Sequence, residues 1–237
     1  MKAINFTTQK IRLVAALFCV AYILIQSFQE YVFRTIPAPN NLTEELLQGA
    51  MPIHISRSML LLLSFFTMIY IFLVIILHDF RKNILLFAIA FLGLFIFCFL
   101  EIGIRSIELF YTQLQMPAAF LQTKDQDVKN SIISNYSAFQ SVQTALYFPL
   151  MLTQAIASAI ISFVFSPRPK INFLIRTAFA LNAFRLVGRL TAMFFDVNWF
   201  DSFSGGLYLP FTIVIFGLIT IWLIKAKDQI HISDRSA

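Results

Sequence analysis

The sequence contains few charged residues for its length. Only 13% of its 237 residues are charged, against the roughly 25% that is typical of a soluble domain. Hydrophobic residues make up 59% of the chain, 28 of them phenylalanine, and the mean hydropathy is +0.78. Such a chain cannot cover its surface in water, so we expect lipid to be part of its solvent. The length favours a single transmembrane domain over residues 1–237, without a second soluble domain.

Cysteine and histidine are also scarce. Cys19 and Cys98 both lie within apolar segments, where they are expected to be small buried residues and not a disulfide or a metal-binding pair. His54, His78 and His231 all fall outside the middle of an apolar segment, which argues against haem ligation within a helical bundle. The sequence has no H-E-x-x-H, G-x-S-x-G or P-loop pattern. It therefore favours a non-enzymatic protein with no catalytic residues, no metal and no cofactor.

Six apolar segments are long enough to cross a bilayer, which requires about 20 residues in a helix. They cover residues 11–33, 58–77, 84–110, 136–165, 171–195 and 207–224. The sequence thus predicts an all-α fold, a polytopic bundle of six transmembrane helices. Almost no polar residue interrupts the second and sixth segments. We therefore expect these two helices to face lipid over much of their circumference.

Lysine and arginine are distributed unevenly between the two sides of these segments. Ten fall on the side of the termini: Lys2, Lys10, Arg12, Arg81, Lys82, Arg168, Lys170, Lys225, Lys227 and Arg235. Four fall on the other side: Arg34, Arg57, Lys124 and Lys129. Because cytoplasmic loops are enriched in these residues, both termini are predicted to be cytoplasmic, and residues 40–50, 115–130 and 198–204 external. The same bias accounts for the net charge of +6 without a nucleic-acid partner.

Two of the external segments contain helix signals of their own. Asn41 is a capping residue followed by acids in the first turn, Glu44 and Glu45, which predicts a short interfacial helix through Leu47. Residues 123–137 are likewise expected to be helical and to run directly into the fourth span.

Four features describe the layout of the connections. An amphipathic segment precedes the second span, a short basic turn runs from His78 to Asn83, a long loop leads into Asn135, and a proline-containing turn covers Ser166 to Lys170. In this layout the chain resembles uncharacterised six-helix families of the bacterial inner membrane. The resemblance implies a multi-pass protein of that membrane, and no particular activity.

The outer halves of the predicted helices contain ionisable and polar side chains. Each ionisable group within a bilayer costs a few kcal/mol and requires a partner or a function. At a rise of about 1.5 Å per residue, the acidic and arginine side chains lie about 21 to 32 Å from the cytoplasmic starts of their helices. Several are spaced four residues apart, on one helix face. The candidate ligand-binding residues are Glu30, Glu101, Arg105, Gln143, Tyr147, Asn182, Arg185 and Arg189.

Three interpretations of this cluster are open. The residues can form a buried ion-pair network that fixes helix packing, with a direct pair between Glu101 and Arg189. They can line an outer-leaflet cavity for a small anionic or zwitterionic ligand or a lipid headgroup, since arginine suits carboxylate and phosphate recognition. They can also form a proton or ion path, with Glu101 as the carrier.

Each interpretation corresponds to a function. The cavity corresponds to a ligand- or lipid-binding membrane protein, with membrane lipids and a small anionic ligand as partners. The network corresponds to an assembly or packing subunit of a larger membrane complex, and the path to a small ion- or proton-coupled transporter. The sequence does not predict an oligomeric state.

Overall fold

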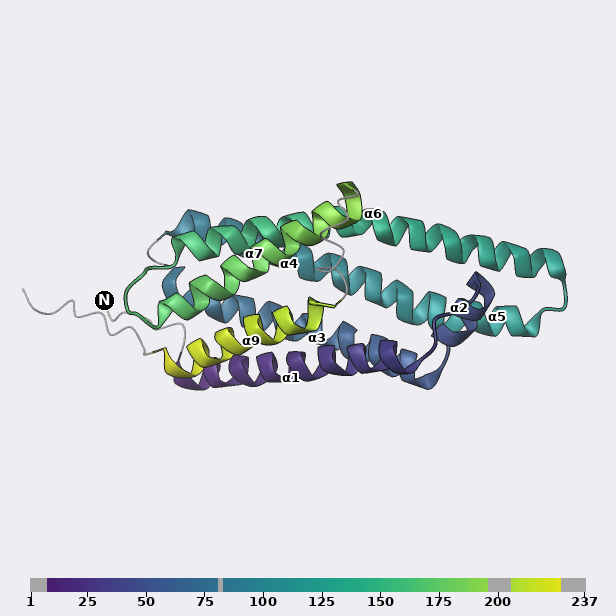
Figure 1. Cartoon of the computed structure of the whole chain (residues 1–237), viewed down its shortest axis with the longest axis horizontal. Coiled ribbons are helices and arrows are strands. Elements are labelled where there is room, and N and C mark those ends of the chain that lie inside the picture. The colour runs from purple at the N-terminus through teal and green to yellow at the C-terminus, as the bar shows by residue number, and fades with distance from the viewer. Residues whose placement is uncertain (1–7, 81–82, 196–205, 227–237) are drawn as a thin grey trace, which may run out of the picture.

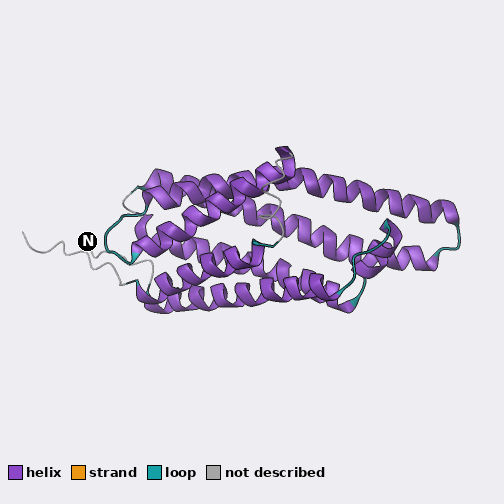
Figure 2. Cartoon of the chain, viewed as in Figure 1, coloured by secondary structure: helices purple, strands orange, loops and turns teal. Residues whose placement is uncertain are grey.

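The structure, a computed structural model, describes residues 8–80, 83–195 and 206–226. Figure 2 shows helices joined by loops, and no strand, in the described ranges. Six helical rods are long and apolar enough to cross a membrane: α1 (Gln9–Thr35), α3 (Pro52–Asp79), the continuous rod Ile84–Gln122, α6 (Gln126–Val164), α7 (Asn172–Phe195) and α9 (Tyr208–Lys225). The predicted all-α bundle of six spans is confirmed, and the chain is a multi-pass membrane protein.

The third rod is not a uniform α-helix. It comprises α4 (Ile84–Ile107), a π-helical segment η2 (Glu108–Gln115) and the short helix α5 (Met116–Gln122). A π-helix closes its hydrogen bonds between residues five apart, and such segments occur often at functional sites. The segment η2 follows directly after the predicted site residues of this rod.

The six rods form a closed ring in which each rod packs against its neighbours in the chain. The rods contact one another in chain order, and α9 closes the ring by packing against α1. Short connections make consecutive helices antiparallel neighbours. Figure 1 shows that α1 begins and α9 ends at the same end of the bundle, as an even number of spans requires. The membrane orientation of that end stays a prediction.

Aromatic side chains close the end of the ring where α1 begins and α9 ends. The Phe165 ring lies 5.5 Å from the rings of both Phe87 and Trp222, edge to face. The Trp222 indole also donates a hydrogen bond to the side-chain oxygen of Asn172 at 3.0 Å. Edge-to-face aromatic pairs of this kind add to the stability gained from burial alone. Polar cavities therefore occur toward the opposite end of the bundle.

The helix α3 is the most enclosed of the six spans, so the second helix faces lipid over less of its circumference than expected. Half of its most apolar stretch is buried, against a third for α9. Leu61, Met68, Ile71 and Ile75 are all nearly inaccessible, because α3 packs between α1 and α4. Lipid tails and protein interiors are equally apolar. The lack of a polar stripe therefore does not separate a lipid-facing helix from a packed one.

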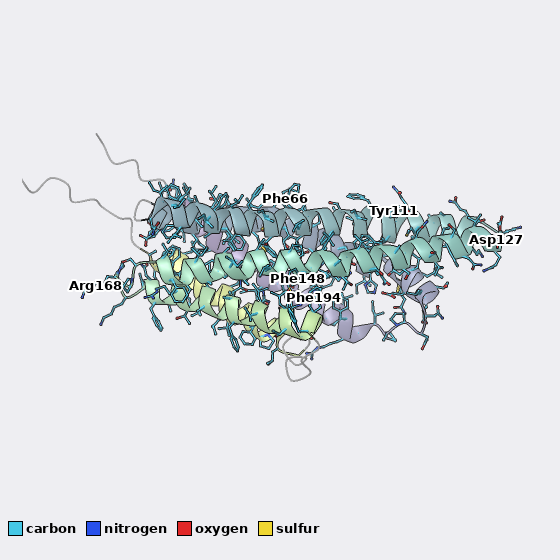
Figure 3. All side chains as sticks on the ribbon, turned by 90° about the horizontal axis from the view of Figure 1, so that it is seen from above. Phe66, Tyr111, Asp127, Phe148, Arg168 and Phe194 are labelled. Atoms are coloured by element: carbon cyan, nitrogen blue, oxygen red, sulfur yellow. The ribbon has the colours of Figure 1, made fainter. Side chains whose placement is uncertain are left out.

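The third and fourth rods are much longer than a membrane span. Each has 39 residues, or about 58 Å at 1.5 Å per residue, against a hydrocarbon thickness of about 30 Å. Figure 1 shows them continuing beyond α1, α7 and α9, and Figure 3 places Asp127 near one end of the molecule and Arg168 near the other. We call residues 108–140 the projecting hairpin.

The predicted helix ends at residues 110 and 136 are therefore corrected. Only Thr123 to Asp125 separate the two rods, in place of a long external loop. Hydropathy marks where a helix leaves the apolar layer, whereas its hydrogen bonds continue into the aqueous region. The predicted helical run of residues 123–137 into the fourth span is confirmed from Gln126 onward.

A short helix, α2 (Leu42–Gly49), packs against the projecting hairpin. As predicted, Asn41 caps it, accepting a hydrogen bond from the backbone N–H of Glu44 at 2.9 Å. The helix α3 then begins at Pro52, which places Arg57 in its second turn and not in an external loop. The predicted external segment 198–204 lies outside the described residues.

Candidate functional site

Two carboxylates and two guanidinium groups form a buried network between α3 and the third rod. Arg105 donates to Glu101 at 3.2 Å and to one oxygen of Glu108 at 2.5 Å. Arg57 donates to the other oxygen of Glu108 at 2.8 Å. The four side chains are between 8% and 16% exposed. Since an unpaired buried charge is strongly destabilising, their mutual compensation is what allows them to be buried.

The π-helical segment η2 determines part of this geometry. Residues five apart share one face of a π-helix, and the Gln113 amide nitrogen lies 3.4 Å from Glu108 and 2.9 Å from the Ser58 hydroxyl. In an α-helix the same residues would lie about 140° apart around the axis. The α-helical spacing of Glu101, Arg105 and Glu108 was visible in the sequence, whereas the position of Gln113 was not.

A polar cavity of about 310 Å³ lies next to this network, and residues of all six rods line it. We call it the inner cavity. Its polar lining consists of Tyr22, Gln26, Gln29, Glu30, Glu101, Arg105, Tyr147, Gln154, Arg185, Arg189 and Tyr208. Its other wall is apolar and includes Phe65, Met68 and Phe97. In Figure 3, Phe148 of α6 and Phe194 of α7 lie close together; their rings are 5.2 Å apart.

Two arginines of α7 lie in the inner cavity without a direct ion pair in the described ranges. Arg185 donates to the Thr212 hydroxyl at 3.2 Å and to the side-chain oxygen of Asn182 at 3.1 Å. The guanidinium of Arg189 lies 5.8 Å from the centre of the Tyr208 ring, and that of Arg185 lies 5.2 Å from it. Aromatic faces attract cations, but they do not neutralise the charge.

The carboxylates of the inner cavity are paired with other arginines. Glu101 pairs with Arg105, and Glu30 pairs with the exposed Arg34 at 2.7 Å. Glu101 and Arg189 do not form a direct ion pair within the described structure, and the predicted energetic coupling between them stays a prediction. The two residues do share the cavity, but Arg105 lies one turn along the same helix and reaches Glu101 directly.

Six of the eight predicted site residues line the inner cavity: Glu30, Glu101, Arg105, Tyr147, Arg185 and Arg189. The other two lie beside it. Gln143 donates to the Tyr147 hydroxyl at 3.2 Å. Asn182 is buried and donates to the Ser158 hydroxyl at 2.9 Å. Their polar groups support cavity residues and do not themselves line the space.

Sequence reasoning missed three residues that shape the site. Arg57 precedes the apolar run of its helix, Gln113 depends on the π-helical turn, and Tyr208 stands at the start of the last span. The Tyr208 hydroxyl donates to the side-chain oxygen of Gln26 at 3.0 Å, which links α9 to α1 across the cavity. An aromatic residue at a helix start is common at membrane interfaces, so its sequence position gave no specific signal.

No family model matches the chain, and neither a curated protein nor a solved structure matches it. The functional argument therefore rests on the site. The fold and the site together define a multi-pass membrane protein whose ring of helices surrounds a cavity with cationic and apolar walls.

Proposed function

We propose that this protein binds a small anionic or zwitterionic ligand, or a lipid headgroup, in the inner cavity. The observation that carries the proposal is the presence there of Arg185 and Arg189 without a carboxylate ion pair in the described part of the chain. Guanidinium groups bind carboxylate and phosphate through paired, charge-assisted hydrogen bonds. The two carboxylates that line the cavity, Glu30 and Glu101, pair with Arg34 and Arg105, so a bound anion would be the direct partner of Arg185 and Arg189.

The apolar wall adds a second requirement for the ligand. Leu61, Phe65, Met68 and Phe97 line the cavity together with the arginines. A ligand with an anionic group and an adjoining apolar part satisfies both walls, because each part is then transferred to a matching environment. Lipids with a phosphate-containing headgroup belong to this class.

The proposal extends to the location of the protein. The concentration of lysine and arginine at the end of the termini supports an orientation with both termini in the cytoplasm. The bacterial inner membrane is proposed from the layout of the connections alone. In that orientation the inner cavity lies in the outer leaflet, and the projecting hairpin extends away from the cytoplasm.

Lipid retention in nanodiscs tests the proposed function. The protein is reconstituted in phosphatidylcholine with a minor fraction of phosphatidylglycerol, and the lipids it retains are counted by native mass spectrometry. Wild type should retain phosphatidylglycerol preferentially. The double variant Arg185→Gln/Arg189→Gln should lower this retention about tenfold or more, as expected for lost hydrogen bonds to charged groups. A rise in the thermal unfolding temperature on addition of inorganic phosphate would indicate a soluble anionic ligand instead.

Arg176→Gln is the matched control. Arg176 belongs to the same helix, but its guanidinium donates to the backbone oxygen of Ser162 at 3.0 Å, and it lines neither cavity. The proposal is wrong if wild type shows no preference for phosphatidylglycerol and no stabilisation by phosphate. Destabilisation of the double variant in that case would assign the arginines to helix packing. Anion uptake into proteoliposomes would identify a transporter.

A further inference from the structure

A second cavity, of about 440 Å³, lies on the other side of the ion-pair network. We call it the outer cavity. Its walls come from the end of α1 and the segment after it, from α2, from the start of α3, from the end of α4, from η2 and from α6. Phe33 and Arg105 line both cavities, so these two side chains lie at the boundary between the two spaces. The volume lies within the range of about 300–1,000 Å³ that is typical of ligand pockets.

The charged groups of the outer cavity are balanced among themselves. Its lining contains two arginines, Arg57 and Arg105, and two glutamates, Glu45 and Glu108. Both arginines donate to Glu108, and Glu45 accepts a hydrogen bond from the Gln140 amide at 2.7 Å. The inner cavity has an excess of positive charge, whereas the outer cavity does not. Its lining therefore does not select for a charged ligand.

Amides provide most of the remaining polar surface. Gln48, Gln113, Gln140 and Gln143 all line the outer cavity, together with the hydroxyl groups of Thr112 and Tyr136. Their amide nitrogens already donate hydrogen bonds to other side chains, so a ligand would meet mainly their acceptor oxygens. A ligand that carries several hydroxyl groups matches this surface, because each hydroxyl can donate one hydrogen bond and accept others.

Three buried polar atoms in the cavity wall point to the same chemistry. The Nε atom of Arg57, the Oε1 atom of Gln113 and the Nε2 atom of His54 are buried without a hydrogen-bond partner in the described structure. Leaving such an atom unsatisfied costs about 1–3 kcal/mol. These atoms have almost no accessible surface, so a ligand reaches them only if a cavity side chain shifts. A hydroxyl group could then accept from the Arg57 atom and donate to the Gln113 atom, whereas a simple anion or cation could serve only one of them.

We propose that the outer cavity binds an uncharged, hydroxyl-rich group, that is, a sugar or polyol. The apolar part of the wall, which includes Phe33, Leu46 and Phe139, fits the carbon faces of such a group. The group can be the headgroup of a glycolipid or a free soluble molecule, and both have the same hydroxyl chemistry. This site is separate from the proposed anion site and does not depend on it.

Gly49 offers a way to block the outer cavity without disturbing the ion pairs. A Cβ atom at this position would lie 3.6 Å from Cγ of Gln113, which is an ordinary contact, and Gly49 lines the cavity. Gly49→Leu therefore adds bulk at the cavity wall. Leucine also has a higher helix propensity than glycine, so α2 should keep its fold. Gly103→Leu is the matched control, because a Cβ atom there meets nothing within 4 Å.

The experiment uses the full chain and two kinds of probe. In nanodiscs of phosphatidylcholine with a minor fraction of monogalactosyl or monoglucosyl diacylglycerol, native mass spectrometry measures glycolipid retention. Saturation-transfer NMR with the methyl galactoside and methyl glucoside measures binding of the free sugars. Wild type should bind at least one of these probes. Gly49→Leu should reduce that binding about tenfold, and Gln113→Leu about three- to tenfold through the loss of a neutral hydrogen bond.

The outcomes separate the two proposed sites. Gly103→Leu and the Arg185→Gln/Arg189→Gln variant should bind the sugar probe like wild type, and Gly49→Leu should retain phosphatidylglycerol. Retention of glycolipid alone identifies a lipid source, and saturation transfer from a free sugar identifies a soluble one. The proposal is overturned if wild type binds neither probe. It is equally overturned if Gly49→Leu binds the probe as well as Gly103→Leu does.

Discussion

Arg57 and Glu108 are 51 residues apart in the sequence and form a buried ion pair, with 2.8 Å between Nη2 and Oε1. The two side chains are 8% and 13% exposed. The second oxygen of Glu108 accepts a hydrogen bond from Arg105. One carboxylate thus serves two guanidinium groups, and it connects α3 to the base of the projecting hairpin.

The Glu108→Gln substitution should strongly destabilise the protein. It removes the only carboxylate paired with Arg57 in the described structure and one of two paired with Arg105. Breaking a buried pair from one side typically costs about 3–5 kcal/mol, because the remaining charge is uncompensated. Denaturant unfolding in detergent micelles measures the loss.

The double variant Arg57→Met/Glu108→Gln is the control for this pair. It removes both partners, so it should recover part of the stability that Glu108→Gln loses. The single variant Arg57→Met completes the comparison. If the stability losses of Arg57→Met and Glu108→Gln add up to the loss of the double variant, Arg57 and Glu108 are not energetically coupled.

These residues also show which parts of the structure can be predicted from the sequence. The spacing of Glu101, Arg105 and Glu108 follows α-helical periodicity, so their common face was predictable. Gln113 joins them only through a π-helical turn, for which the sequence carries no signal that we could find. Arg57 was placed outside its helix, because hydropathy locates the apolar run and not the helix start.

The six spans were predictable because crossing a bilayer requires a long apolar helix. Their packing was not, because the side chains that face lipid and those that face other helices are both apolar. Leu61 and Leu63 illustrate this limit: they are 3% and 52% exposed, with the same side chain in the same helix. Only the arrangement of the ring distinguishes them.

This pair of leucines tests the enclosed position of α3. Leu61→Ala removes a packed side chain and should cost about 2–5 kcal/mol of stability. Leu63→Ala is the matched control; its side chain is half exposed, so its loss should be well below that of Leu61→Ala. Thermal unfolding of both variants in the same detergent measures the difference. Equal losses would mean that α3 does not pack inside the ring as described.

Gly93 allows the close approach of α4 and α6. A Cβ atom at this position would lie 3.0 Å from both the Cβ atom of Ala157 and the backbone oxygen of Thr153. Gly93→Val should therefore separate the two helices and cost about 1–3 kcal/mol, the typical penalty for overpacking. A Cβ atom at Gly103, on the same helix, would meet nothing within 4 Å, so Gly103→Val should leave the melting temperature close to that of wild type. A Gly93→Val protein as stable as Gly103→Val would exclude this close contact.

The stability of the first turn of α2 should depend on pH, because it involves the carboxyl group of Glu44. Hydrogen bonds from the backbone N–H and then the side-chain amide of Asn40, with a further one from Gln48, lower the pKa of the Glu44 carboxyl below its usual value. Because the pKa is lower in the folded state, the ionised carboxyl stabilises the turn at pH values above the unfolded pKa of about 4.3. It is lost as the pH falls through the folded-state value.

Hydrogen exchange of the α2 amides, corrected for intrinsic rates, measures this effect. Protection should decrease as the pH falls from neutral through the folded-state pKa of Glu44, because the carboxyl then becomes protonated. The Glu44→Gln variant has no charge to lose, so its protection should be lower at neutral pH and should change little on acidification. A pH response in the variant as large as that of wild type would assign the effect to another group.

The last prediction concerns membrane orientation, for which Gln126 and Asn83 are suitable labelling positions. Both side chains are exposed, and they lie at opposite ends of the third and fourth rods. The native Cys19 and Cys98 are buried, so they should not react in the folded protein. With both termini in the cytoplasm, a membrane-impermeant maleimide should label Gln126→Cys in intact cells and should label Asn83→Cys only after the membrane is permeabilised.

The opposite pattern would invert the topology, because the basic residues that predict it would then lie outside. In that case both cavities would face the cytoplasmic leaflet, and their ligands would have to be present on that side.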